Sequence, residues 1–475
     1  MSILTGIPIN TARYEFLANC LNGTGGFITG DYLVKYARES DAKYLKRKEL
    51  AWYQNLLRPA CTRFVGYLSR KPPKRESNNP LIDKFIDDVD WQGNNIDIFL
   101  SEFFTQAKAR GAMLLLVEMP QATAKTLEQQ LTQRQIPYLI AIPPESIRSY
   151  SMNKQGLFEY VEIQTMMQVE GKLQLVIQGW SETQWWVSLN GTIIQGAEHP
   201  LGCCPVLGFS EGQFPCFGEF AQIGDLSKRL FNLNSELDEI LRSQTFSLLT
   251  YQMTEQQAAT FDPAKMALEV GTNNTMFYQG TQAPSFAQPA TGPAEVYLKT
   301  IASIEEKIKG ISLAVELSRT AGTGPESGIA LAIRFEALNA ALSSFSKRAE
   351  DLERKLFDVV SRWLKMANTT TVAYSKGYEL ADITTELTTL ASYEAAQMSP
   401  EVILAKKQQI INLDFSNMEH EELQALLDSL DVTDPAMPLL EARLAMLEAN
   451  QPHANSGGLP ANDPANDPTQ MMGGN

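Results

Sequence analysis

The chain has 475 residues, 44% of them hydrophobic, which is enough for two or three packed domains. Its formal net charge of -15 argues against a protein that coats nucleic acid, because affinity for the phosphate backbone comes mainly from clustered lysine and arginine. Since no apolar run approaches the length of a membrane span and the N-terminus lacks the basic region of a signal peptide, we expect no membrane partner.

The N-terminal part of the chain predicts helices followed by a strand. Residues 1–30 are expected to form an irregular arm with a loose glycine cluster. A helical stretch is expected over 41–69. Residues 95–110 carry apolar side chains on one side, and Gly111 ends this helix before a strand at 112–117. Helix, glycine and strand in this order favour an α/β layer.

The same part of the chain holds an excess of positive charge. Between Lys35 and Arg75 we count twelve basic residues against three acidic ones, a local balance of +9. One interpretation is a solvated helix face. The other is contact with an acidic neighbour or with encapsidated DNA.

An antiparallel meander is predicted over 157–194. Val- and Ile-rich runs alternate with polar residues there, and the pairs at 170–171 and 190–191 are placed as hairpin turns. Packing in a core or on a sheet face is favoured over ligand stacking for the three tryptophans of this segment, Trp180, Trp185 and Trp186.

Helical spacing returns over 220–251. A mixed, proline-containing region follows at 252–293, with a strand expected at 276–278. A second helix is expected at 295–316. The order is therefore helix, small β-containing insert, helix.

A glycine-rich loop then leads into one very long helix that reaches to about residue 367. Roughly forty residues in a helix span about 60 Å. The loop contains Gly322, Gly324 and Gly328, and Ser327 is a plausible N-cap. No Gly-Lys-Ser/Thr follows, which argues against a phosphate-binding loop. Apolar residues recur along the helix at steps of four and three, as in a coiled coil or bundle element: Leu331, Phe335, Leu338, Leu342, Phe345, Ala349, Leu352, Leu356, Val359, Trp363 and Met366.

The C-terminal hundred residues are acidic. From Lys376 onward sixteen acidic and four basic residues give a balance of -12. Short helices are expected, one of them beginning with Ser399 as N-cap and Pro400 at the first helical position. The composition from residue 450 onward is typical of disorder.

Candidate chemistry is thin, and we expect no catalytic residue, no cofactor and no metal. The odd number of cysteines, without a Cys-x-x-Cys pair, suggests a reducing cytosol. His199 with Cys203, Cys204 and Cys216 is a poor zinc set, because adjacent cysteines are poor partners for one tetrahedral metal. Buried, inert thiols are the favoured interpretation.

Three aspartates precede Trp91, namely Asp87, Asp88 and Asp90. In isolation they suit a divalent cation. A charged loop end is the favoured interpretation.

The loop and helix at 327–342, SGIALAIRFEALNAAL, resemble the tunnel loop and long helix of bacteriophage portal proteins. Four earlier segments follow in the order seen in a portal-like family of tailed phages, and the resemblance covers roughly residues 20–370. These segments are YLVKYARESDAKYLKRKELAWYQNLLRPACTRFVGYLSRKPP, DWQGNNIDIFLSEFFTQAKARGAMLLLVEMP, IPYLIAIPPESIRSY and HPLGCCPVLGF.

The resemblance implies an α+β portal fold. Its expected parts are an α/β wing at 1–219, a stem helix at 220–251, a small β-containing clip at 252–293, a second stem helix at 294–317, a tunnel loop at 318–327, a long wing helix at 328–368, a helical crown at 376–449 and a disordered tail at 450–475.

The resemblance also implies a structural role in the virion rather than an enzyme. About twelve copies would form a ring at one capsid vertex, after assembly in the host cytoplasm, and double-stranded DNA would be packaged and ejected through its channel. The implied partners are the large terminase subunit, the major capsid and scaffolding proteins, and head-tail adaptor proteins. The residues implied at the channel are Arg319, Thr320, Gly322, Thr323, Gly324, Glu326, Ser327, Lys307 and Lys309.

Two alternatives stay open. One is a head-tail connector that forms no pore. The other is a phage-encoded enzyme on a helical scaffold, with Cys203 and Cys204 or the Asp87 cluster as its site.

Overall fold

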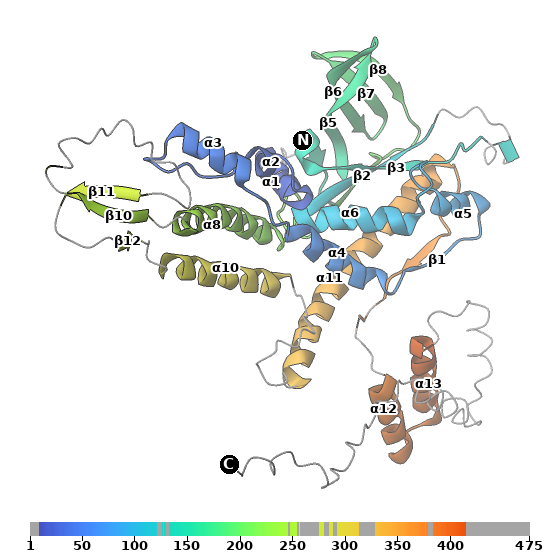
Figure 1. Ribbon diagram of the computed structural model, residues 1–475. Helices are drawn as coiled ribbons and strands as arrows, with labels where there is room; N and C mark the ends of the chain where they lie inside the picture. The colour runs from blue at the N-terminus through green and yellow to red at the C-terminus, as the bar shows by residue number, and fades with distance from the viewer. Residues whose placement is uncertain are drawn as a thin grey trace, which may run out of the picture. The chain divides into compact units, whose positions relative to one another are not determined.

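The computed structural model divides the chain into two compact units, Met1–Glu379 and Leu380–Asn475 (Figure 1). The structure describes residues 9–120, 126, 128–129, 133–245, 248–253, 256, 275–279, 285–287, 292–312, 328–375, 377–378 and 383–414. Helices and antiparallel sheets both contribute to the first unit, which makes the protein an α+β protein. None of the helices in the described part is long and apolar enough to cross a membrane.

The first unit begins with helices, so the expectation of an irregular arm over 1–30 is wrong for the residues described. The helices of this region are α1 (Thr11–Asn22), α2 (Gly26–Thr29), α3 (Asp41–Leu50), α4 (Leu57–Ser69), α5 (Pro80–Asp87) and α6 (Ile96–Arg110). The Asn10 side chain accepts a hydrogen bond from the Arg13 amide and caps α1, and Gly23 ends it in a left-handed conformation. Tyr14 and Leu17 of α1 are fully buried, so its apolar face belongs to the core.

The expected single helix over 41–69 is also wrong, because residues 51–56 separate α3 from α4. The chain turns extended at Ala51. In the break, the Tyr53 hydroxyl donates to the Cys20 carbonyl and the Asn55 amide to the Leu21 carbonyl, both at 2.8 Å. These carbonyls lie at the end of α1, where no intrahelical donor remains. The break therefore satisfies the end of a helix thirty residues earlier in the chain.

A three-stranded sheet follows α6. Gly111 adopts a φ of 90°, and a Cβ there would lie 1.9 Å from the Gly218 nitrogen, so this turn requires glycine. The central strand β2 (Ala112–Glu118) is buried between β3 (Tyr138–Ile142) and β9 (Val206–Ser210), and both neighbours are antiparallel to it. The layer is thus an antiparallel one covered by helices.

The meander is a five-stranded antiparallel sheet that begins earlier than predicted. Its strands in order are β4 (Ile147–Met152), β5 (Phe158–Val169), β6 (Lys172–Ser181), β7 (Gln184–Leu189) and β8 (Thr192–Glu198), and a short 3-10 turn, η1 (Pro144–Ser146), precedes them. Both predicted hairpin turns are confirmed, since residues 170–171 and 190–191 all have positive φ. Trp180 is 5% exposed and packs in a core cluster.

Helix α8 (Ala221–Thr245) ends earlier than predicted. Strand β10 (Leu248–Met253) follows, where the sequence was expected to stay helical to residue 251. Strand β10 pairs in parallel with β11 (Thr275–Gln279) and antiparallel with β12 (Ser285–Ala287), and the expected strand at 276–278 is confirmed. Helix α10 (Gly292–Ile311) then runs beside α8 (Figure 1).

The long helix α11 (Gly328–Trp363) is confirmed and has 36 residues. Its stripe is buried against the protein's own core. Phe345, 4% exposed, packs against Phe64 of α4, Phe104 of α6 and Phe209 of β9. At the end of the helix, the Trp363 indole donates to the Val117 carbonyl at 3.0 Å. A helix that looks like a coiled-coil element therefore holds the layers of the first unit together.

Two further pairings complete the described chain. In the first unit, β1 (Lys74–Glu76) pairs antiparallel with β13 (Thr371–Ala373), which follows α11. The second unit contains α12 (Ile383–Ala395) and α13 (Pro400–Asp414), joined by a 3.1 Å ion pair between Glu394 and Lys407. Helix α13 begins at Pro400 as predicted. The tail expected to be disordered, 450–475, lies outside the described residues.

Candidate nucleic-acid channel and the networks that position it

Two of the nine residues that the resemblance assigns to a channel lie in the described part of the chain, Lys307 and Lys309 of α10. The other seven belong to the glycine-rich loop and lie outside the described residues: Arg319, Thr320, Gly322, Thr323, Gly324, Glu326 and Ser327. The described part of this candidate site is therefore the α8/α10 pair.

Helix α10 is fixed to its surroundings by its buried side. Ile304 and Ile308, one turn apart, are 3% and 4% exposed and belong to the main core. The Tyr297 hydroxyl donates to Glu236 of α8 at 2.8 Å. Hydrogen bonding to that carboxylate raises the pKa of Tyr297, so the phenol stays protonated as the donor. The opposite side of α10 faces solvent.

Lys307 lies on the exposed side of α10 at a shallow cavity of about 520 Å³. The cavity is lined by Gln222, Asp225, Leu226, Lys307, Gly310 and Ile311. Asp225 is already bound by Arg13 through two nitrogens, at 2.5 and 2.7 Å. Lys307 has no ion-pair partner among the residues that the structure describes. Its charge, in the last turns of α10, is favoured by the helix dipole.

Lys309 differs from Lys307 because it pairs with Glu306 at 3.1 Å. Both partners are largely exposed, so the pair contributes little to stability. The pair nevertheless offsets the lysine charge locally. Of the two lysines, Lys307 is the one whose charge is available to a polyanion.

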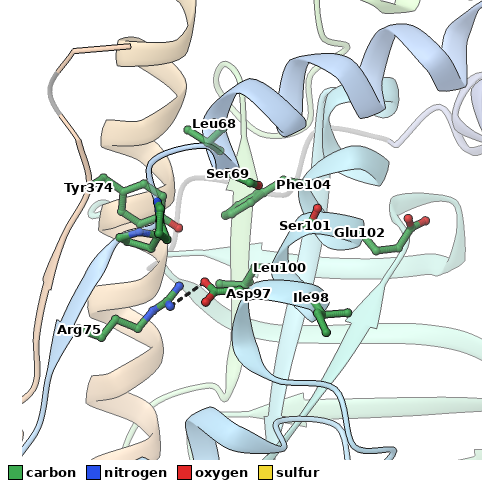
Figure 2. Close-up of a pocket in the computed structure, with 12 residues that line it drawn as sticks. Leu68, Ser69, Arg75, Asp97, Ile98, Leu100, Ser101, Glu102, Phe104 and Tyr374 are labelled. Atoms are coloured by element: carbon green, nitrogen blue, oxygen red, sulfur yellow. Dashed lines mark hydrogen bonds and ion pairs between the residues drawn. The ribbon is translucent and has the colours of Figure 1, made fainter. Parts of the chain in front are cut away.

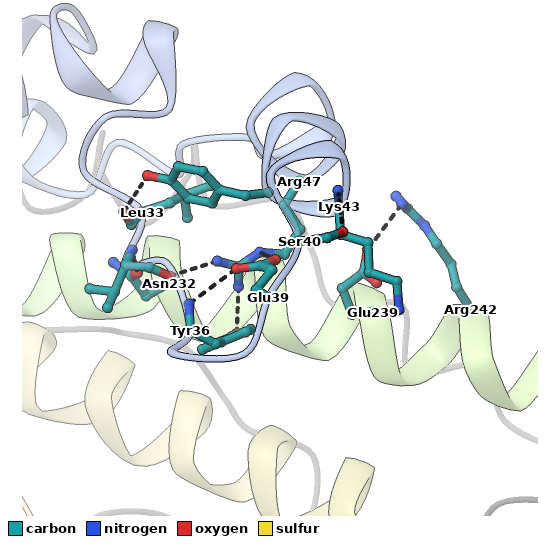
Figure 3. A network of polar contacts seen from close by, with 11 residues as sticks. Leu33, Tyr36, Glu39, Ser40, Lys43, Arg47, Asn232, Glu239 and Arg242 are labelled. Carbon is teal, nitrogen blue, oxygen red and sulfur yellow. Dashed lines mark hydrogen bonds and ion pairs between the residues drawn. The ribbon is translucent and has the colours of Figure 1, made fainter.

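A buried arginine anchors the N-terminal basic stretch on α8 (Figure 3). Arg47 of α3 is 3% exposed and pairs with Glu39 at 2.9 Å. Its guanidinium also lies 4.1 Å from the centre of the Tyr36 ring and donates to the Val34 carbonyl at 2.6 Å. Asn232 of α8 accepts a hydrogen bond from the Val34 amide at 2.8 Å. Residues 34–47 are thereby tied to the first helix of the candidate channel.

Ion pairing also accounts for half of the basic stretch. Six of its twelve basic residues have an acidic partner in the described part of the chain: Lys35, Lys46, Arg47, Lys48, Arg58 and Arg75. Four of the acids that take part, Asp31, Asp97, Glu102 and Glu353, lie outside the stretch in sequence. Much of the local balance of +9 is therefore compensated in the fold.

A second buried arginine joins β1 to α11 beside a cavity of about 470 Å³ (Figure 2). Arg75 binds both oxygens of Glu353, at 2.6 and 3.0 Å, and Asp97 at 2.7 Å. Glu353 is fully buried, and the Tyr374 hydroxyl donates to it. The two carboxylates raise the pKa of Arg75 although burial opposes them. This network was missed from the sequence.

The candidate zinc residues do not converge. His199 contacts the Ser181 carbonyl through Nε2 at 3.1 Å, and the Cys204 thiol lies 3.7 Å from the Trp180 carbonyl. The Cys216 thiol lies 3.3 Å from the Gly111 carbonyl. In the described ranges, no group of three His, Cys, Asp or Glu side chains is placed to hold a metal ion. Burial raises the pKa of Cys204 to about 12, which keeps this thiol protonated at neutral pH.

The three aspartates before Trp91 form a loop end. Asp88 pairs with Arg134 at 2.9 Å. Asp90 accepts hydrogen bonds from the Gln92 amide at 2.9 Å and from the Asn94 side chain at 2.7 Å. These bonds lower the pKa of Asp90 although burial opposes them. The carboxylates are thus engaged in local structure, as expected for a charged loop end.

Comparison with solved structures finds similar chains over most of this one. A chain of the virion of a native gene transfer agent particle has 10% identity and a TM-score of 0.43, and covers 84% of this chain and 92% of its own. A chain of the neck of an empty gene transfer agent particle has 8% identity and a TM-score of 0.42, with coverages of 83% and 95%. An HK97-family phage portal protein from Corynebacterium diphtheriae has 8% identity and a TM-score of 0.32, with coverages of 72% and 97%.

The family that the sequence resembles is thus represented among the similar structures. No protein-family model and no curated protein matches the sequence.

Proposed function

We propose that this protein is a portal subunit, a structural protein that forms a ring of about twelve copies at one vertex of a phage capsid. One observation carries the proposal. Helices α8 and α10 pack side by side, the chain between them contributes the small sheet of β10, β11 and β12, and α11 follows a glycine-rich segment. This is the order of stem helix, clip, stem helix, tunnel loop and wing helix that the sequence motifs imply.

In this proposal double-stranded DNA passes through the channel of the ring, first during packaging and later during ejection. A channel wall that lets DNA slide must not hold it, and phosphate affinity grows with the number of cations that contact the backbone. The described part of α10 suits this requirement, because Lys307 is exposed while Glu306 offsets Lys309. Arg319 of the loop would add a transient phosphate contact.

The remaining parts would serve the partners. The clip at 252–293 would bind the large terminase subunit, which supplies the ATP hydrolysis, and afterwards the head-tail adaptor proteins. The wing would contact the major capsid protein, and scaffolding protein would take part in assembly. These assignments follow the family resemblance.

Electron microscopy of the purified protein tests the ring. We expect closed rings with a central hole, and light scattering should give a mass of many subunits. A mass of one or two subunits across a wide concentration range would contradict the proposal. Rings without a hole would favour a connector that forms no pore, and a monomer with turnover would favour an enzyme.

A packaging assay with terminase tests the channel. Lys307→Gln should leave rings intact and change the packaging rate by an amount that shrinks as salt rises, because contacts with phosphate are screened. Lys172→Gln, at an exposed hairpin of the meander, is the matched control and should have no effect. An equal effect of both variants would remove Lys307 from the channel.

The loop is tested by valine substitution. Valine restricts the backbone freedom of glycine, so replacing Gly322 and Gly324 with Val should slow packaging while rings still form. A variant that fails to assemble and behaves as an unfolded chain would show that the loop is a structural turn.

A further inference from the structure

One face of the meander is apolar and uncovered. Side chains on a strand alternate between faces, and one face of this sheet packs on the core through Val161, Ile163 and Trp180. The cross-strand pair Met166 and Leu175 lies on the other face and is 53% and 52% exposed. The same outward face continues, in register, through Leu173, Ile177, Trp186 and Ile193.

This outward face is shaped as well as apolar. Trp186 lies against Gly179, where a Cβ would come within 2.2 Å of the indole ring. The glycine therefore lets the ring lie flat on the sheet. Leu173 and Ile193 are 69% and 64% exposed beside it. Contiguous exposed apolar surface of this kind marks an interaction site.

The charges on the outward face are acidic. Register places Glu162 opposite Gly179 and Glu198 opposite Gln184, so both carboxylates share the face of Trp186. Glu198 is exposed. A partner that covers this face should therefore offer apolar side chains with cations at their edge.

The chain itself offers such a surface on α3 and the segment after it. Leu45, Leu50 and Trp52 are 58%, 38% and 53% exposed. Lys43, one turn from the buried Arg47 that anchors this helix, is exposed and has no ion-pair partner in the part of the chain that the structure describes. Arg38 is exposed just before the helix and is likewise without one.

We propose that the α3 surface of one copy docks on the outward meander face of a second copy. The two surfaces are opposite in charge, so the contact is complementary when they meet each other and repulsive when two α3 surfaces meet. A contact between two different surfaces is heterologous, and repeating it from copy to copy gives a ring when the rotation closes. The inference rests on the proposed ring and names the surfaces that join its subunits.

Cysteine crosslinking in the full chain tests the contact. We would make Leu45→Cys and Ile193→Cys in one chain and treat it with a short bismaleimide. The expected result is a ladder of covalent oligomers on denaturing gels. The matched control, Leu45→Cys with Ile98→Cys, uses a residue of α6 that is 58% exposed and lies on neither surface, and should give no ladder. The wild-type chain shows the background of the five native cysteines.

Charge reversal gives an independent measurement. Lys43→Glu should lower the association constant at least tenfold at low salt, and adding Glu198→Lys should restore most of it, because the pair is then reversed. Circular dichroism checks that each variant is folded. Lys172→Glu, outside the α3 surface, should leave association unchanged.

The outcomes separate the two proposals. Rings that form without the 45–193 ladder and without rescue would overturn this contact and leave the ring standing. A wild-type chain that stays monomeric would overturn both. A 45–193 crosslink confined to dimers would support the contact and contradict closure.

Discussion

The buried carboxylate of Glu353 gives the sharpest test of how α11 is held. Glu353→Gln keeps the shape of the side chain and removes its charge. Arg75, whose side chain is 7% exposed, would then keep one carboxylate partner, Asp97, which is 53% exposed. Tyr374 would lose the charged acceptor of its hydroxyl.

The size of the effect follows from burial. Breaking a buried ion pair by removing one partner costs about 3–5 kcal/mol, because the other charge stays behind in a poorly solvated site. Glutamine retains one acceptor oxygen and Asp97 remains, so we expect the lower end, about 3 kcal/mol. That is roughly a hundredfold in the unfolding equilibrium constant.

The matched control lies two residues away on the same helix. Asp351→Asn also turns a carboxylate into an amide, but Asp351 is 48% exposed and its partners Arg354 and Lys355 are 59% and 42% exposed. Exposed pairs of this kind contribute about 0.3–0.5 kcal/mol each. Urea unfolding followed by tryptophan fluorescence measures both variants without adding salt.

A double variant separates charge from shape. Arg75→Met with Glu353→Leu removes both charges together, and should recover most of the stability lost in Glu353→Gln, since replacing a buried pair by apolar side chains is often neutral. If Glu353→Gln costs no more than Asp351→Asn, the network does not hold β1 to α11 and the reasoning fails.

Three further predictions follow from single sites. Gly179→Ala should cost about 1–3 kcal/mol and shift the tryptophan emission, because its Cβ would displace the Trp186 ring, whereas Gly66→Ala, on α4 with open space around it, should gain about 0.5–1 kcal/mol. Burial lowers the pKa of His199 below 6.5, so the unfolded chain binds the proton more readily and stability should fall as the pH drops through 6.5. His199→Gln should flatten that part of the wild-type pH profile, and an unchanged profile would contradict the assignment.

The parts of the fold that were predictable are those that short segments decide. Hairpin turns at 170–171 and 190–191 are local backbone choices, and the glycine at 111 ends α6 by its own conformation. The stripe on α11 is likewise a local period, although whether it faces its own core or another chain is not. Helix α1 was missed although a signal was present, since Asn10 precedes apolar residues at helical spacing.

The parts that were missed depend on partners far away in sequence. The break at 51–56 serves the carbonyls at the end of α1, and no local pattern shows it. Arg75 and Glu353 are 278 residues apart, and each alone reads as a surface charge. The same holds for Lys307, whose neighbour Asp225 is occupied by Arg13. Sequence periodicity gives faces of elements, whereas charge pairing needs the fold.

These distant pairs bear on how the candidate channel would work. The glycine-rich loop connects α10 to α11. Helix α10 is tied to α8 through Tyr297, and the Arg47 network ties α8 to the N-terminal layer. Helix α11 is tied to the same layer through Glu353. Buried charge pairs cost most when one partner is lost, so they fix position more than they add stability. Both helices that flank the loop are therefore held independently of it, and substitutions confined to the loop should alter passage of DNA without altering the fold.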